Sequence, residues 1–341
     1  MTAPSPEQQL SFIAKVQRLF AEGDFTATYK FALLIALADL AVEQAGDDGG
    51  PVRLTNRAIA AKFIELYWQQ AAPYSSKTGT EPSVLAQNIG EQASIINALV
   101  NFRRIRPAAT LVTASGQPEY AQLLRVVTAT VSAQPLVYMQ NLGGQTAPFL
   151  YTRVRGAVLL LPGVAYCLRR FQALVQQLAR SHWIHHIKKN RLNLPVLGEA
   201  DDLESFLFET PRATLAVIGA GLRRLDARCF YCRGPVVEAD VDHFIPFSMY
   251  QKDLAHNFVL AHPACNRSKS DTLAARPHLE QWLEHATRNN DALQEIGQSA
   301  GRIANLASSR AVTRWGYSNA ITGGGRAWVR ASKYETIDER Y

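Results

Sequence analysis

Two pairs of metal-binding side chains stand out in the sequence, the Cys-x-x-Cys pair Cys229 and Cys232 and the His-x-x-Cys pair His262 and Cys265. Within each pair the spacing lets both side chains reach one ion, and 29 residues separate the two pairs. Together they offer the closed tetrahedral nitrogen and sulfur set of structural Zn²⁺. His256 is near enough to be an alternative third ligand. A lone Cys-x-x-Cys pair would suggest a redox site, but the second pair favours zinc as a staple for a small fold.

Carboxylate, imidazole and amide side chains lie between and beside these pairs. Asp242 and His243 are adjacent, Asn257 follows fourteen positions after His243, and Asn266 comes directly after Cys265. Hydrolysis of a phosphodiester requires an activated water, neutralisation of the phosphate and help for the leaving oxygen. One divalent ion and one base can supply all three. These residue types are therefore the ones that phosphodiester hydrolysis needs.

The order of these residues resembles an HNH endonuclease module, the ββα-metal nuclease family, over roughly residues 227–273. Many such modules have four cysteines in the zinc pairs, and this chain departs from that pattern at His262. The resemblance implies that His243 is the general base. It also implies that Asp242 and Asn266 hold a catalytic Mg²⁺ or Mn²⁺, which suits hard oxygen ligands. Asn257 would belong to the same catalytic group, tying the loop that orients His243.

Basic residues concentrate in the middle of the chain, where residues 101–200 hold twelve Lys and Arg but two acidic residues. The whole chain carries a net charge of +7. Such a one-sided segment suits a polyanion such as nucleic acid, although a surface that is basic for solubility is the alternative. The predicted nucleic-acid contacts combine the start of the module's helix with this segment: Arg267, Lys269, Arg169, Arg170, Lys188 and Lys189.

The elements that must position these groups are mainly helical. Apolar residues recur at helical spacing, and we expect helices at 7–21, 27–45, 56–70 (capped by Thr55), 83–104, 164–189, 201–209, 212–226, 276–287 and 289–308. Apolar and β-branched runs within 121–161 predict short strands. Asp242 and His243 would face opposite sides of a regular strand, so the strand must end or twist there, and Pro246 fits such an ending.

The expected helix 164–189 has an apolar stripe that includes Val164, Leu168 and Val175. Polar and basic residues lie off that stripe and predict an exposed basic face, namely Arg169, Arg170, Gln176, Gln177 and Arg180. Cations near the end of the helix also interact favourably with its dipole, which is the alternative reason for their presence.

The fold class that we expect is mainly α, with a small zinc-stapled ββα-metal module and short strands in the helical N-terminal region. Residues 1–195 would be a basic substrate-recognition region, 196–288 the nuclease domain, and 289–341 a helix and tail that pack on the body. Of four cysteines, Cys167 alone lies outside the motif and is expected as a buried free thiol. Without an apolar run long enough to span a membrane, we expect a cytoplasmic protein.

The sequence favours a metal-dependent endonuclease that hydrolyses duplex DNA. By analogy, a freestanding nuclease of this layout suggests prokaryotic restriction or anti-phage defence. A homodimer would supply the two active sites that a double-strand break needs. The alternatives are an RNA-cleaving or toxin-type nuclease and a non-catalytic, zinc-stapled DNA-binding protein.

Overall fold

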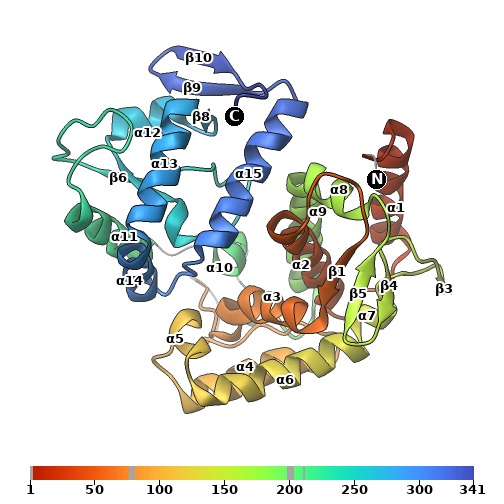
Figure 1. Cartoon of the computed structure of the whole chain (residues 1–341). Coiled ribbons are helices and arrows are strands. Elements are labelled where there is room, and N and C mark those ends of the chain that lie inside the picture. Colours follow the sequence, from red (N-terminus) through yellow and green to blue (C-terminus); the bar gives the residue numbers. More distant parts are fainter. Residues whose placement is uncertain (1–2, 77–80, 198–202, 210–211) are drawn as a thin grey trace. The chain divides into compact units, whose positions relative to one another are not determined.

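The chain divides into two compact units. The computed structural model describes residues 3–76, 81–197, 203–209 and 212–341 (Figure 1). The first unit comprises residues 1–109 and 114–209, and the second comprises 110–113 and 210–341. Residues 289–341, expected as a separate helix and tail, therefore lie in the same unit as the two metal-binding pairs. Within the described part of the chain, no helix is both long and apolar enough to cross a membrane.

The first unit is built around α2 (Tyr29–Gln44), which is buried on every side from Tyr29 to Val42. A helix that is apolar all round needs cover on all faces, and α3, α8 and α9 pack against it. The other helices of this unit are α1 (Pro6–Glu22), α3 (Asn56–Trp68), η1 (Gln69–Ala71), α4 (Ser94–Ile105), α6 (Pro118–Ala133), α7 (Pro135–Tyr138), α8 (Val164–Arg170), α9 (Gln172–Lys189) and α10 (Leu203–Phe208), while α5 (Leu111–Ser115) lies at the boundary between the units.

Short antiparallel strands complete the first unit. Strand β5 (Ala157–Leu160) lies between β1 (Val52–Thr55) and β4 (Tyr151–Val154), and β2 (Asn141–Leu142) pairs with β3 (Gln145–Thr146). Thr55 caps α3 by accepting a hydrogen bond from the Ala58 amide, as the sequence predicts. The mainly helical fold class with a few short strands is confirmed.

Two expectations for the first unit are wrong. The helix expected over 83–104 forms only as α4, and the first of the strands expected within 121–161, at residues 123–131, is part of helix α6. In α6 the buried residues are Leu123, Leu124, Val127 and Val131, which follow helical spacing. The β-branched residues suggested a strand. In the helix, however, the Thr128 hydroxyl donates to the Leu124 carbonyl, so its hydrogen-bonding need is met within α6.

The long helix expected over 164–189 is two helices, α8 and α9, separated at Phe171. Its predicted basic face is wrong for Arg169, Gln176 and Arg180, which are buried, whereas Gln177 is exposed and Arg170 is half-buried. The Arg169 guanidinium donates to Asp47 at 2.8 Å, and the Gln176 amide donates to Asp39 at 2.8 Å. Pairing with buried Asp39 and with exposed Asp47 thus accompanies the burial of Gln176 and Arg169, and periodicity alone does not show such pairing.

The second unit contains a β-hairpin followed by a helix. Strand β6 (Asp240–His243) pairs antiparallel with β7 (Phe258–Ala261), and α12 (Pro263–Lys269) follows. Four further helices and a small sheet in the order β10-β9-β8 surround this core, together with the short η2: α11 (Arg212–Leu225), η2 (Ala255–Asn257), α13 (Arg276–Arg288), α14 (Asn290–Ala300), α15 (Leu306–Thr322), β8 (Leu273–Ala274), β9 (Arg326–Arg330) and β10 (Lys333–Thr336).

The single helix expected over 289–308 is wrong, because α14 ends at Gly301 in the left-handed conformation (φ 65°) and α15 begins five residues later. Close helix packing holds the hairpin in place. A Cβ at Gly219 of α11 would lie 3.0 Å from Val241 of β6, and one at Gly221 would lie 2.6 Å from Ile296 of α14. Helix α11 therefore lies directly against both β6 and α14.

Candidate active site and zinc cluster

The two metal-binding pairs converge on one point. The ligand atoms of Cys229, Cys232, His262 and Cys265 all lie within 4.8 Å of one another. The first pair is held by a tight turn in which the Cys229 amide donates to Gly234 O at 2.8 Å. In the second pair His262 is the N-cap of α12, so Cys265 falls on the same side one turn later. The geometry fits the tetrahedral zinc site that the sequence predicts.

His262 is the histidine of this cluster. Its Nδ1 lies 3.2 Å from Cys232 Sγ, and its Nε2 lies 3.0 Å from the Pro235 carbonyl. A hydrogen bond from the nitrogen that does not face the metal fixes the orientation of a histidine ligand. The alternative, His256, is buried elsewhere with its Nε2 3.1 Å from Asn290 Oδ1.

The thiols of the cluster affect one another's ionisation. Burial, and then the neighbouring Cys229 and Cys232, raise the pKa of Cys265 to about 12. Burial opposes ionisation of Cys229 too, but amide donors including those of Cys232 and His262 lower its pKa overall. Thiolates packed so closely repel one another unless they share a cation. A bound Zn²⁺ would be such a cation.

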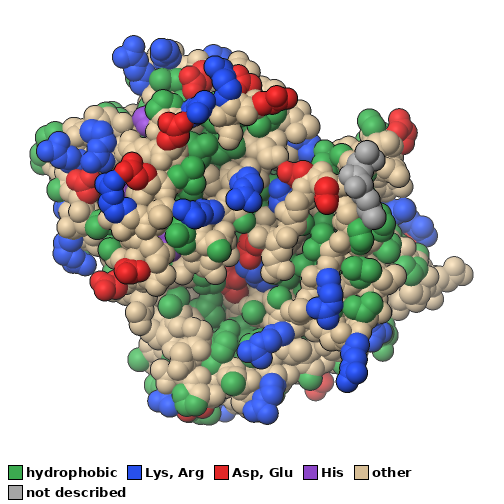
Figure 2. Space-filling view, viewed as in Figure 1, with side chains coloured by type: hydrophobic (Ala, Val, Ile, Leu, Met, Phe, Trp, Pro, Cys, Tyr) green, Lys and Arg blue, Asp and Glu red, His purple; other side chains and the backbone are tan. Residues whose placement is uncertain are grey.

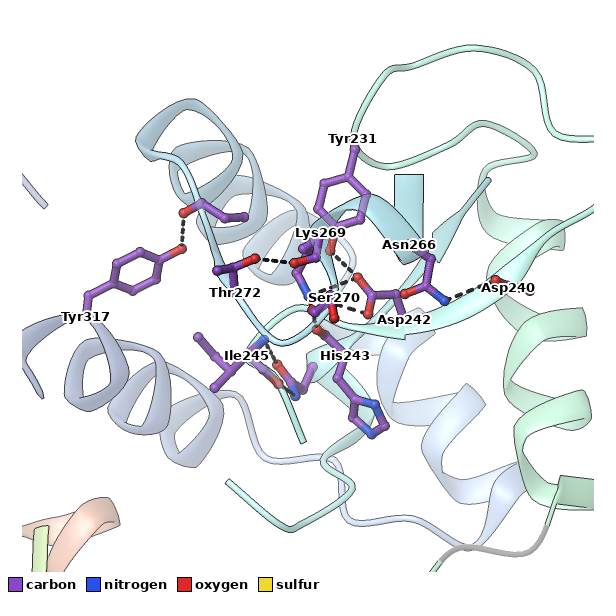
Figure 3. Close-up of polar contacts among 12 residues, drawn as sticks. Tyr231, Asp240, Asp242, His243, Ile245, Asn266, Lys269, Ser270, Thr272 and Tyr317 are labelled. Carbon is purple, nitrogen blue, oxygen red and sulfur yellow. Dashed lines mark hydrogen bonds and ion pairs between the residues drawn. The ribbon is translucent and has the colours of Figure 1, made fainter. Parts of the chain in front are cut away.

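Asp242 is a buried carboxylate at the end of β6 (Figure 3). It accepts a hydrogen bond from the Tyr231 hydroxyl at 2.5 Å and lies 3.1 Å from Lys269 Nζ. Lys269 also donates to the His243 carbonyl at 2.9 Å. Burial, and then the charge of Asp242, raise the pKa of Tyr231 well above its usual value, so the phenol stays a donor. Burial lowers the pKa of Lys269, against the opposing effect of Asp242.

Asn266 lies beside Asp242 and is hydrogen-bonded to a second carboxylate, that of Asp240. Its amide nitrogen donates to Asp240 Oδ2 at 3.0 Å, and Figure 3 shows the Asn266 amide between Asp240 and Asp242. Asp240 and Asp242 alternate along β6 and so share one face of the strand. The oxygen-rich donor set of Asp242 and Asn266 fits a hard divalent ion. Sequence reasoning missed Asp240, although the Asp-Val-Asp alternation was a usable signal.

His243 points away from this carboxylate group, as Figure 3 shows. Its Nε2 lies 2.6 Å from Asp253 Oδ1, and its ring centroid lies 5.3 Å from that of Phe247 and 4.7 Å from that of Phe258. Asp253 is a second residue that sequence reasoning missed, because only the folded loop brings it back to the strand.

Asn257 fastens the loop that follows His243. Its amide nitrogen donates to the Ile245 carbonyl at 2.9 Å, and its amide oxygen accepts from the Ile245 amide at 2.8 Å. The Phe244 amide donates in turn to the Asn257 carbonyl at 2.7 Å. Three hydrogen bonds therefore hold the backbone next to His243, which is the kind of contact that orienting this side chain requires.

Comparison with known families agrees with this arrangement. Residues 9–195, more than half of the chain, match the family model of a domain of unknown function (DUF8808), and residues 236–275 match that of an HNH endonuclease. The chain belongs to the DUF8808 family. Its second unit carries an HNH endonuclease module, a match that begins after the first cysteine pair. No curated protein and no solved structure matches this DUF8808 chain.

The basic residues predicted to contact nucleic acid fall into two groups. Arg267 of the HNH module and Lys188 and Lys189 of the DUF8808 region are exposed, and Arg170 is half-buried. Lys269 is 1% exposed against Asp242, and Arg169 is buried against Asp47, so neither presents its charge to a phosphate on the surface. On the visible face, Lys and Arg side chains are spread among others and form no continuous area (Figure 2).

Proposed function

We propose that this protein is a metal-dependent endonuclease that hydrolyses phosphodiester bonds of duplex DNA in the cytoplasm. The observation that carries the proposal is the end of β6, where Asp242 and His243 are adjacent and Asn266 of α12 lies beside Asp242 (Figure 3). Phosphodiester hydrolysis needs a general base and a hard-ion site, and consecutive residues of β6 would supply the base His243 and the ion ligand Asp242. The match of residues 236–275 to the HNH endonuclease family supports this chemistry.

Each side chain has a distinct task in the proposed reaction. His243 takes a proton from the attacking water as the water oxygen bonds to phosphorus. The bond from phosphorus to the leaving oxygen breaks, and that oxygen keeps the electron pair and takes a proton from solvent water. Asp242 and Asn266 would hold Mg²⁺ or Mn²⁺, which supplies charge neutralisation at the phosphate when bound. Lys269 and Tyr231 hold the Asp242 carboxylate in place by an ion pair and a hydrogen bond. Exposed Arg267 is placed to contact the phosphate backbone.

The DUF8808 region would select and hold the substrate, because an HNH module by itself reads little sequence. Arg170, Lys188 and Lys189 are its proposed backbone contacts. We further propose, by analogy alone, a role in restriction or anti-phage defence, with a homodimer supplying two active sites for a double-strand break.

One incubation series tests the substrate. The full chain is incubated with Mg²⁺ and supercoiled plasmid, linear duplex, methylated duplex or RNA, with EDTA as the metal-free control. We expect nicked or linear plasmid in Mg²⁺ and intact plasmid in EDTA. If only RNA is degraded, the substrate is RNA and not DNA. If DNA is bound but not cleaved, the protein is a non-catalytic DNA-binding protein.

The general base is tested by His243→Ala. We expect cleavage to slow by about 10²–10⁴-fold, since that is what general-base catalysis typically contributes. DNA affinity should stay at the wild-type value. His185→Ala, an exposed histidine on α9, is the matched control and should cleave normally. Wild-type turnover by His243→Ala would remove this residue from the mechanism.

A further inference from the structure

We propose that Asp253 is the positioning residue for His243, fixing which ring nitrogen is free to take a proton. This inference rests on the proposed nuclease function for its consequence. The contact itself is a structural feature: Asp253 Oδ1 lies 2.6 Å from His243 Nε2. The Asp253 side chain is 5% exposed, and the imidazole is 21% exposed.

The position of Asp253 is set by the backbone on either side of it. Asn257 and Ile245 are joined by two side-chain hydrogen bonds, which close the loop between β6 and η2. The Ala255 amide donates to the Ile303 carbonyl at 2.9 Å, which anchors the chain two residues after Asp253. These hydrogen bonds hold the loop that brings Asp253 back to the end of β6.

A buried carboxylate without a partner is unfavourable. The contact between Asp253 and His243 should therefore contribute more to stability than an exposed ion pair, which contributes little. Among the described residues, His243 is the hydrogen-bond partner shown for the Asp253 side chain. Phe247 and Phe258 flank the imidazole and restrict its rotation. The imidazole is therefore held by the contact of its Nε2 with Asp253 and by packing against the two phenylalanine rings.

The chemistry follows from the donor inventory of the two groups. A carboxylate accepts hydrogen bonds, and a neutral imidazole has one donor nitrogen and one acceptor nitrogen. With Nε2–H donating to Asp253, Nδ1 is the nitrogen that carries a lone pair. An aspartate holds the catalytic histidine in the required tautomer in the same way in serine protease triads.

The contact is tested first without any substrate. ¹⁵N-histidine labelling of the full chain, with the His243 signal assigned through His243→Gln, reports the tautomer by long-range ¹H–¹⁵N correlation. We expect the Nε2–H form in the wild type and a mixture, or the Nδ1–H form, in Asp253→Asn. An Nδ1–H tautomer in the wild type, or no change in Asp253→Asn, would overturn the inference.

The catalytic consequence is measured on the same near-isosteric variant. Asp253→Asn should lower single-turnover cleavage in Mg²⁺ by about 10²–10⁴-fold, the scale of losing an orienting carboxylate, with DNA affinity within twofold of wild type. Asp291→Asn, an exposed aspartate on α14, is the control and should cleave normally. Full activity of Asp253→Asn would contradict the role. If the wild type cleaves no nucleic acid, the proposed function fails while the tautomer measurement still decides the contact.

Discussion

Lys269 and Asp242 form a deeply buried ion pair of the HNH module. Lys269 is 1% exposed, and its ammonium reaches both Asp242 and the His243 carbonyl. Removing one member of a buried pair leaves the other charge without compensation, which costs more than the net value of the pair itself. Lys269 therefore acts on the site from inside, as the counter-charge of the carboxylate.

Lys269→Met should lower the free energy of unfolding of the second unit by about 3–5 kcal/mol. Because Mg²⁺ would replace the missing positive charge, we expect the ion to raise the Tm of this variant more than that of the wild type. Thermal unfolding followed by circular dichroism, with and without Mg²⁺, measures both effects. Tyr231→Phe, which removes only a hydroxyl, is the milder comparison. Equal stabilisation of Lys269→Met and wild type by Mg²⁺ would argue against a metal site at Asp242.

At the scale of residues, the sequence predicts which residues form the site better than it predicts how those residues contact one another. Spacing indicated the zinc ligands and the adjacent Asp242 and His243, because those patterns are local. Asp253 and Tyr231 could not be found this way, since both reach the site only through the folded loop and the turn after Cys229. Lys269 was recognised as basic, but its burial depends on the packing of α12 against β6.

At the scale of elements, the Cys and His side chains that could hold zinc join a turn before the hairpin to the start of a helix after it. The Phe230 amide donates to the Leu260 carbonyl at 2.7 Å, so the first cysteine pair is attached to β7 as well. Helix α12, which carries Asn266, is only seven residues long. A helix so short is not stable alone, and its position depends on the ligands at its first turn.

Cys229→Ser should therefore release zinc and unfold the module rather than only slow it, because the binding of structural zinc contributes folding free energy. Elemental analysis should find about one zinc per wild-type chain, retained under mild chelation that already stops cleavage. Cys167→Ser, a buried cysteine of the first unit, is the control for loss of a thiol and should keep its zinc. Active wild-type protein free of zinc would contradict this arrangement.

Helix α11 depends on close approach at Gly221. An alanine Cβ there would lie 2.6 Å from Ile296, so Gly221→Ala should destabilise the second unit by about 1–3 kcal/mol through overpacking, despite the better helix propensity of alanine. Thermal unfolding provides the measurement, and adding Ile296→Ala should recover part of the loss. Gly46→Ala, where no atom lies within 4 Å of the new Cβ, is the control. A Gly221→Ala variant as stable as wild type would show that α11 can shift.

The sequence predicted these elements unevenly. Helices with one apolar face, such as α1 and α13, were found within one or two residues of their ends. α6 was mistaken for a strand because its valines and threonines are common in sheets, and tertiary burial overrides such preferences. The break between α8 and α9 had no proline or glycine at Phe171 to signal it.

At the scale of the whole molecule, the positive charge of residues 101–200 is a poorer guide to substrate binding than the sequence suggests, because part of it is buried or paired. Arg169 and Arg180 are buried, and Arg106 pairs with Glu119 at 2.8 Å. Lys188 and Lys189, at the exposed end of α9, are better placed to meet a phosphate backbone. Counting charges in a sequence therefore overstates the surface that a polyanion can use.

The double variant Lys188→Gln, Lys189→Gln should weaken DNA binding at low salt and reduce the log–log salt slope by about 2, because each phosphate contact contributes about 0.9. The slope is measured by fluorescence anisotropy between low and physiological salt. Lys15→Gln, an exposed lysine of α1, is the control. Arg169→Gln should instead lower the Tm, since it loses buried bonds to Asp47 and to the Val42 carbonyl. A double variant with the wild-type slope would place the DNA elsewhere.

The zinc cluster has one exposed edge, where Cys232 meets solvent while Cys229 is buried. An oxidant would reach Cys232 first, and conversion of its sulfur to a sulfenic acid would remove a metal ligand. Release of the ion would loosen the turn and α12 together, and Asn266 would lose its place beside Asp242. If the cluster holds zinc, the stability of the proposed active site would therefore depend on the local balance of peroxide and thiol reductant.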